Sequence, residues 1–326
     1  MQVLVTGATG KVGAHFLHRF LADPKWRDWD VRALCHHRLI EETDRLSVVQ
    51  GTISDRPTVI RAMQGITHVV HMATCKETPE DAMDVAVKGM FWLLEEARVS
   101  PSFRQFILIG GDCTVGHFFV EHDAPVTEET ARTPYPGCYA LSKVLEEVML
   151  EQTYIQYDLN GCCLRAPWIM EKDDFRYSLS FGDDVFGGPV WKDLVAPEEA
   201  RRHHQQGTVP LLRDASGAPL KRNFVHVDDL VAAILCALDN PQAHQQLFNI
   251  SMDAPVDYAA LAAYLQRSRG LDSIDIASDF HSNWLVNEKA KKRLGWQPAY
   301  DLEKLVESAW AYQRAEDSPR KVWYPG

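Results

Sequence analysis

The sequence has no pair of cysteines at the CxxC spacing and no regular spacing of metal ligands. Its seven cysteines are an odd number and are scattered along the chain. Neither a disulfide framework nor a zinc ribbon is therefore indicated. The adjacent His203 and His204 have no carboxylate at a matching spacing, so they fit a solvated helix better than a metal site. We predict reduced thiols and no bound metal.

Positive charge and long apolar runs are also scarce. The chain has 34 Lys and Arg against 45 Asp and Glu, a net charge of −11. A chain this acidic lacks the overall field that attracts nucleic acid or an anionic membrane. No apolar run approaches the roughly 18 residues of a membrane span, and the first residues do not form a signal peptide. We predict a cytoplasmic protein without nucleic-acid or membrane partners.

The 326 residues instead contain short apolar runs that alternate with longer amphipathic stretches. A chain of this length has room for about two domains. The apolar runs predict buried strands at residues 2–5, 31–35, 47–49, 68–71, 106–109 and 162–164. Helical spacing lies between them, most clearly at residues 11–22, 79–97 and 138–152. Such alternation predicts an α/β fold, a Rossmann-type doubly wound parallel sheet.

The pattern weakens after Pro167. Residues 171–221 are rich in glycine, proline and charge and have little periodicity, whereas a helix and a strand return at 227–238 and 247–250. We predict two parts, a dinucleotide-binding domain and a smaller C-terminal substrate lobe. The domain is assigned residues 1–170, with 223–250 returning to it, and the lobe is assigned 171–222 and 251–326.

A glycine-rich turn follows the first predicted strand. Its sequence is TGATGKVG, with Gly7, Gly10 and Gly13 at the spacing of a dinucleotide-binding turn. Glycines there allow a tight turn and a close backbone approach, and the N-terminus of the next helix offers free N–H groups to a pyrophosphate. The strand–turn–helix context makes this signal specific.

Tyr139 and Lys143 are the second chemical signal. A separation of four residues on a helix places both side chains on one face. A nearby ammonium favours the tyrosinate, so we expect Lys143 to lower the pKa of Tyr139. Such a tyrosine exchanges a proton with a substrate hydroxyl or carbonyl while a hydride moves.

These pieces resemble the extended short-chain dehydrogenase/reductase superfamily, in particular its NAD-dependent epimerase/dehydratase family. The resemblance runs along essentially the whole chain, through the ordered segments TGATGKVG (6–13), HMAT (71–74), YALSK (139–143), LRAP (164–167) and RNFVHVDD (222–229). It implies a nicotinamide cofactor, hydride transfer with Tyr139 as acid/base, and a nicotinamide ribose held by Lys143. It also implies a homodimer through helices 79–97 and 138–152, with Met83, Val87, Phe91, Leu145 and Met149 in the seam, unless these residues face the sheet instead.

The cofactor residues follow from this resemblance and from the loop after the second strand. They are Gly7, Thr9, Gly10, Lys11, Val12, Gly13, His36, Arg38, Thr52, Ile53, Met72, Ala73, Tyr139, Lys143 and Pro167. NAD-specific relatives place an acid at the end of the second strand, where this chain has Cys35. Arg38 and the neighbouring histidines are suited to a 2′-phosphate, unless they are only surface residues of a loop. We predict NADP, with NAD as the alternative.

The donor for the reacting oxygen departs from the family pattern. The family's Ser or Thr hydroxyl falls at Gly111, which follows Gly110. Thr114 is our leading replacement, while Cys113 or a backbone N–H are alternatives. The glycine pair itself has a steric interpretation, clearance for the nicotinamide. Asp112 matches an acidic residue of sugar-nucleotide dehydratases. The Glu that accompanies it in those enzymes is replaced by Cys113 here, which argues against a dehydratase function.

The substrate is assigned to five residues, Thr74, Asp112, Cys113, Trp168 and Arg222. Arg222 matches a diphosphate-binding position of sugar-nucleotide members, although an ion pair with Asp228 or Asp229 fits it equally well. The favoured function is an NAD(P)-dependent oxidoreductase or epimerase of a carbohydrate, polyol or sugar acid, with Tyr139, Lys143 and Thr114 as the catalytic set. The alternatives are a non-catalytic NADP(H)-sensing protein and a reductase of a simple ketone or aldehyde.

Overall fold

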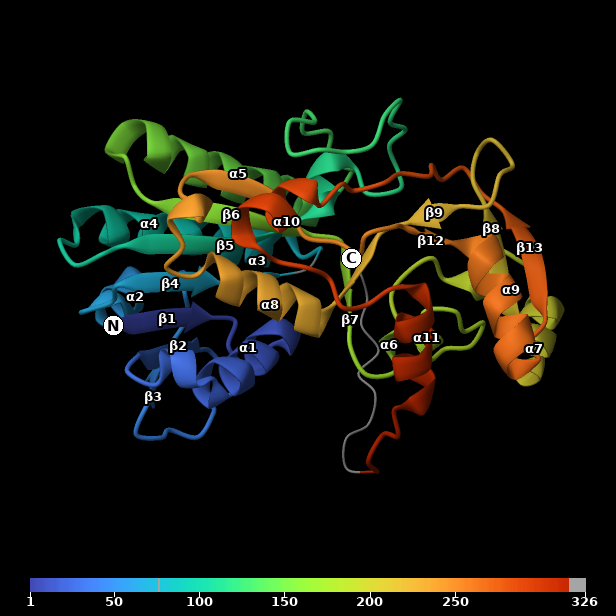
Figure 1. The fold of residues 1–326 in the computed structure, drawn as a ribbon, viewed down its shortest axis with the longest axis horizontal. Helices are drawn as coiled ribbons and strands as arrows, with labels where there is room; N and C mark the ends of the chain where they lie inside the picture. The colour runs from blue at the N-terminus through green and yellow to red at the C-terminus, as the bar shows by residue number, and fades with distance from the viewer. Residues whose placement is uncertain (76, 317–326) are drawn as a thin grey trace.

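A computed structural model describes residues 1–75 and 77–316 of the chain. Its centre is a parallel sheet of seven strands in the order β11-β6-β5-β4-β1-β2-β3 (Figure 1). The strands are β1 (Gln2–Thr6), β2 (Asp30–Cys35), β3 (Leu46–Gln50), β4 (His68–His71), β5 (Gln105–Gly111), β6 (Gly161–Ala166) and β11 (Gln246–Asn249). The order reverses at β1 and β4, which makes the sheet doubly wound and confirms the predicted fold class.

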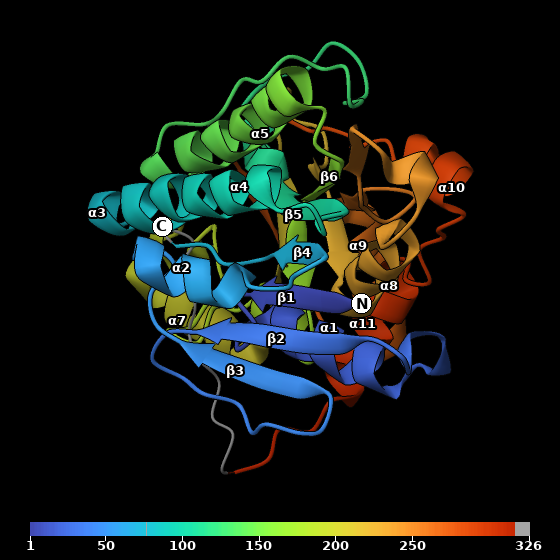
Figure 2. The same cartoon turned by 90° about the vertical axis from the view of Figure 1, so that its left-hand side faces the viewer.

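Helices cover both faces of this sheet (Figure 2). One face packs against α1 (Lys11–Ala22) and α8 (Val227–Ala237), whose apolar sides share a core with Val5, Ile107 and Leu164. The opposite face packs against α2 (Arg56–Met63), α4 (Met90–Val99) and α5 (Cys138–Tyr157). Burial on both faces explains why the strands are continuous apolar runs rather than alternating ones.

The predicted helix at residues 79–97 is three consecutive segments. They are α3 (Pro79–Asp81), a π-helical stretch η2 (Ala82–Gly89) and α4. A methyl group placed at Gly89 would lie 2.7 Å from the Ile53 side chain, so the absence of a side chain lets this helix approach the loop after β3. Short π-helical stretches are frequent near functional sites.

The remaining elements form a second core beyond the carboxyl ends of the strands (Figure 1). Residues 171–221 have little periodicity in the sequence, yet they contain short helices, the strand at 209–213 and the first residue of the strand at 221–222. The helices of this part are α6 (Asp174–Tyr177), η4 (Trp191–Asp193), α7 (Pro197–Gln206), α9 (Tyr258–Arg269) and α11 (Leu302–Ala311). The strands pair in twos as β10 (Phe224–His226) with β7 (Trp168–Met170), β12 (Val256–Asp257) with β9 (Lys221–Arg222), and β13 (Ser273–Ala277) with β8 (Val209–Arg213).

Short elements complete the described chain, namely η1 (Pro24–Trp26), η3 (Asp112–Val115), η5 (Pro241–Ala243) and α10 (Glu288–Leu294). Ala290, Leu294 and Trp296 pack in the core shared by α1 and α8, although they lie in the range assigned to the substrate lobe. The division into domain and lobe stays a prediction.

Candidate active site

The glycine-rich turn connects β1 to α1 at the middle of the sheet. Gly7 has φ +69°, and a methyl group there would lie 2.7 Å from the backbone of Met72 and Ala73 at the end of β4. A methyl group at Gly13 would lie 2.3 Å from the Gly7 carbonyl oxygen. Gly10 has no side chain with which to cap α1. The first-turn N–H groups of α1 are thus free for an anion, and the residues fit a dinucleotide pyrophosphate.

A cavity of about 530 Å³ opens from this turn along the carboxyl ends of the strands. Fifteen predicted site residues line it: Gly7, Gly10, Lys11, Val12, Gly13, Arg38, Met72, Thr74, Asp112, Cys113, Tyr139, Lys143, Pro167, Trp168 and Arg222. Six predicted residues are not among its lining: Thr9, His36, Thr52, Ile53, Ala73 and Thr114. The cavity therefore brings the glycine turn and the Tyr139–Lys143 pair to one place.

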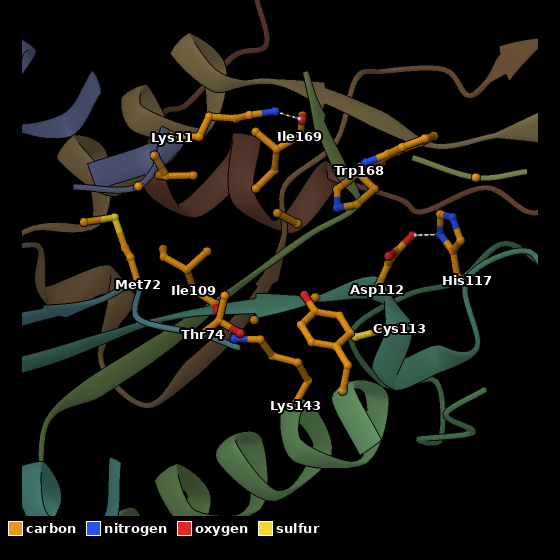
Figure 3. Close-up of a pocket in the computed structure, with 18 of the residues that line it drawn as sticks. Lys11, Met72, Thr74, Ile109, Asp112, Cys113, His117, Lys143, Trp168 and Ile169 are labelled. Atoms are coloured by element: carbon orange, nitrogen blue, oxygen red, sulfur yellow. Dashed lines mark hydrogen bonds and ion pairs between the residues drawn. The ribbon is translucent and has the colours of Figure 1, made fainter. Parts of the chain in front are cut away.

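Lys143 projects from α5 into the cavity near Thr74 (Figure 3). Its Nζ donates to Glu146 Oε2 at 2.8 Å and to the Ile109 carbonyl oxygen at 3.2 Å. Glu146 is fully buried, and its Oε1 has no hydrogen-bond partner among the described residues. The ammonium is therefore neutralised by a buried carboxylate that the sequence analysis did not single out.

The pKa of Tyr139 differs in direction from the expectation. Burial raises it well above its usual value, and the neighbouring acidic side chains of Cys113, Tyr135 and Glu146 raise it further. We expected Lys143 to lower this pKa. Because Glu146 pairs with Lys143, the field of the ammonium at the phenol is offset.

The two glycines that end β5 have different surroundings. A methyl group at Gly110 would lie 2.7 Å from the Cys163 sulfur, inside the core. A methyl group at Gly111 would lie 3.8 Å from the Tyr139 hydroxyl oxygen and 3.0 Å from the Cys113 sulfur. Gly111 thus faces the reacting side of the cavity, and the Cys113 thiol borders the space that a side chain there would fill.

Thr114 does not meet Tyr139 in the cavity. It is fully buried on η3, and its hydroxyl lies 3.0 Å from the Gly111 carbonyl oxygen and 3.1 Å from Glu147 Oε1. Both are acceptors, so the single hydroxyl proton is already engaged. This geometry gives no support to Thr114 as the donor for a substrate oxygen.

Lys11 reaches across the cavity from the glycine turn (Figure 3). Its Nζ donates to the Ile169 carbonyl oxygen at 3.0 Å and to Asp174 Oδ2 at 2.5 Å. The cation of the turn is therefore tied to residues that follow β6 rather than left free for phosphate. Asp174 lies in α6, within the 171–221 stretch whose sequence has little periodicity.

The end of β2 carries no carboxylate. Cys35 is buried, the His36 and His37 rings lie 3.6 Å apart, and the exposed Arg38 lines the cavity. Arg38 is the cation of this loop that faces the dinucleotide site.

Arg222 pairs with neither of the acids considered from the sequence. Asp228 bonds to His15, and Asp229 accepts from backbone N–H groups at residues 299 and 300. The Arg222 guanidinium instead bonds to His117, which bonds in turn to Asp112. The Asp112–His117 contact is drawn in Figure 3.

The model of the NAD dependent epimerase/dehydratase family matches residues 3–170, which is more than half of the chain. The chain belongs to this family. Its members are nicotinamide-dependent enzymes, so the resemblance predicted from the motifs is confirmed.

Individual members are distant in sequence. UDP-glucuronate 4-epimerase 3 of Arabidopsis thaliana is 24% identical over 93% of this chain and 74% of its own. The bifunctional dihydroflavonol 4-reductase/flavanone 4-reductase of Malus domestica is 20% identical over 78% of this chain and 73% of its own. A short-chain dehydrogenase/reductase superfamily protein from Agrobacterium tumefaciens, solved with bound NAD, has a TM-score of 0.76 at 23% identity and covers 95% of this chain and 96% of its own. That structural likeness shows the fold.

The described residues contain neither a cluster of metal ligands nor a membrane-spanning helix. Within residues 1–75 and 77–316, no three His, Cys, Asp or Glu side chains gather at a possible metal site. No helix in that part of the chain is both long and apolar enough to cross a membrane.

Proposed function

We propose that this family member is an NADP(H)-dependent oxidoreductase or epimerase that interconverts a secondary alcohol and a ketone on a carbohydrate or related polyol. The observation that carries the proposal is the single cavity lined by the glycine turn, Tyr139 and Lys143. A relative named as an epimerase of UDP-glucuronate supports a carbohydrate substrate.

The chain's own residues supply proton transfer and positioning. When bound, the nicotinamide dinucleotide takes or supplies the hydride. Because burial raises its pKa, Tyr139 carries its proton at neutral pH and gives it to the substrate oxygen in the reducing direction. In the oxidising direction the phenolate, formed at higher pH, accepts the proton of the substrate hydroxyl. Lys143, fixed by Glu146 and the Ile109 carbonyl, would hold the nicotinamide ribose. The glycine turn and the N-terminus of α1 hold the pyrophosphate.

Arg38 supports the preference for NADP(H). The strand that ends at Cys35 presents no carboxylate to repel a 2′-phosphate, and Arg38 lines the cavity nearby. Direct titration tests this part: Arg38→Ala should weaken NADPH binding and leave NADH binding unchanged. Tighter binding of NADH than of NADPH by the native protein would refute the preference.

The Tyr139→Phe variant tests the reaction. It keeps the ring and removes the hydroxyl, so kcat should fall by about 10²–10⁴-fold while the Kd of the cofactor stays the same. Tyr154→Phe is a matched control, because that buried hydroxyl lies on the same helix but outside the cavity. Native turnover by Tyr139→Phe would reject the proposed mechanism.

A second candidate is a reductase of a ketone that is not a carbohydrate. The cavity wall favours it, because Phe118, Phe119, Tyr135, Trp168, Phe186 and Phe280 make much of the lining apolar. A screen of cyclic ketones and free sugars, read as nicotinamide oxidation, separates the two candidates. The third alternative, a non-catalytic sensor, does not agree with membership of an enzyme family.

A further inference from the structure

The part of the cavity around Arg222 is here called the distal half. Its walls are aromatic and come from segments distant in sequence: Phe118, Phe119, Tyr135, Trp168 and Phe280. Its charged residues are Asp112 and Arg222. What this half of the cavity binds depends on whether the charge of Arg222 is available to a ligand.

The Arg222 guanidinium makes hydrogen bonds and ring contacts with several protein groups. Its Nε and Nη2 lie 3.2 and 3.0 Å from His117 Nε2, and its Nη1 donates to the Gly188 carbonyl oxygen at 2.9 Å. Its centre lies 4.1 Å from the Trp168 ring and 4.3 Å from the Phe118 ring. Both the donating edge and the faces of the guanidinium are thus already in contact with protein groups.

His117 links this cation to a carboxylate. Its Nδ1 lies 2.5 Å from Asp112 Oδ2, which accepts the Nδ1 proton, so Nε2 is left to accept from Arg222. Burial lowers the pKa of His117, which keeps the ring neutral in this arrangement. Asp112, His117 and Arg222 therefore form a linear hydrogen-bonded series, in which the negative charge of Asp112 compensates the positive charge of Arg222.

The other cations of the cavity do not replace Arg222. Lys11 is paired with Asp174, and Lys143 is paired with Glu146. Arg38 follows β2, at the dinucleotide end. Among the described lining residues, the distal half thus offers no uncompensated positive charge. A diphosphate placed there would have to break the charge-assisted hydrogen bonds of Arg222 without other cations to receive it.

We propose that the distal half binds an uncharged cyclic alcohol or ketone that carries no phosphate, such as a free sugar ring, and not a nucleotide sugar. The ring faces lie against the aromatic walls, and Arg222 is a positioning residue of the wall instead of an anion-binding one. This inference rests on the proposed function and narrows its substrate class.

The first test measures binding of UDP to the NADPH-loaded protein by calorimetry. We expect the Kd of UDP to be weaker than about 1 mM. Asp112→Asn keeps the shape and removes the compensating charge, so it should bind UDP at least about tenfold more tightly than the native protein. Thermal melts establish that the variant is folded.

Two results would overturn the inference. One is micromolar binding of UDP by the native protein that Arg222→Met abolishes, and the other is a higher kcat/KM for UDP-sugars than for free sugars. UDP binding needs no turnover, so it is independent of the reaction. Native activity in Tyr139→Phe would contradict only the proposed function. Tight UDP binding by the native protein, together with an inactive Tyr139→Phe, would contradict only this inference.

Discussion

The residues around the reacting oxygen give the sharpest prediction at the scale of single side chains. Gly111→Ser restores a hydroxyl beside the Tyr139 hydroxyl, because the Cβ position at Gly111 lies 3.8 Å from that oxygen. Gly111 has an extended backbone with φ −140°, which serine adopts readily. The Cys113 sulfur, 3.0 Å from that position, must yield by a few tenths of an ångström. We expect a folded enzyme whose kcat is unchanged or higher.

Gly110→Ser is the matched control for that variant. Its side chain would meet the Cys163 sulfur at 2.7 Å inside the core. Overpacking of this kind costs about 1–3 kcal/mol, so the melting temperature should fall. A loss of kcat beyond tenfold in folded Gly111→Ser would instead mean that Gly111 provides clearance for the cofactor.

Glu146 gives a prediction about pH. Its carboxylate raises the pKa of Tyr139 and offsets the charge of Lys143. In Glu146→Gln the ammonium acts on the phenol without that offset, so the pKa of Tyr139 should fall. Oxidation needs the phenolate, and its rate rises as pH passes this pKa. The rising limb should therefore move to lower pH.

The pH profile of kcat/KM for alcohol oxidation measures this shift. Glu151→Gln removes a carboxylate from the same helix at a site outside the cavity and should leave the profile in place. A profile that does not move in Glu146→Gln, or moves to higher pH, would show that Glu146 has no electrostatic role at Tyr139.

At the scale of elements, a buried cluster fixes α5 against the sheet. Glu147 on α5 accepts from Arg165 of β6 at 2.9 Å, from Arg132 at 2.8 Å and from Thr114 of η3 at 3.1 Å. The helix that carries Tyr139 is thus tied to the strand and the turn that border the cavity. Because Thr114 belongs to this cluster, we propose a structural role for its hydroxyl.

Thr114→Val tests that assignment. The variant keeps the shape and removes one of several donors to Glu147, so we expect a loss of about 1 kcal/mol of stability with kcat unchanged. Chemical denaturation and steady-state turnover measure the two quantities. A kcat that falls a hundredfold at unchanged stability would return Thr114 to the catalytic set.

The sequence was sufficient for the elements of the central sheet but not for the elements of residues 171–221 or for the pairing of charges. Apolar runs located the seven strands of the sheet, because both of its faces are covered and their burial leaves a local pattern. The partners of Lys11 and Arg222 lie 163 and 105 residues away, at Asp174 and His117. Such contacts depend on tertiary packing, which spacing along the chain does not encode.

Glu146 illustrates the same limit at short range. It lies three residues after Lys143, a spacing typical of a solvated helix face. Only the packing of α5 against β5 turns that face inward and makes the pair a buried one. Gly110 and Gly111 are adjacent in the sequence, but a side chain at Gly110 would face the core and one at Gly111 would face Tyr139.

At the scale of the whole molecule, α5 and the 79–99 helix lie side by side on one face of the sheet (Figures 1 and 2). Large apolar side chains remain exposed along them, namely Met83, Phe91, Leu141 and Val148. Of the predicted seam, Met83 and Phe91 are exposed, Val87 and Leu145 are half-buried, and Met149 packs against the core. Apolar side chains gathered on neighbouring helices are typical of an interface.

We therefore propose a homodimer through these helices, with a mass twice the 36.9 kDa of the chain.

A Phe91→Glu and Leu141→Glu double variant places carboxylates in the seam and should shift the protein to a monomer, because burying unpaired charge is costly. Light scattering at micromolar concentration measures the mass. Leu194→Glu is the control, since that exposed leucine follows η4 in the C-terminal part and should leave the dimer intact. A native protein that scatters as a monomer would dismiss the interface. Because Tyr139 lies on α5, loss of the dimer should also lower kcat if the partner helps to hold that helix.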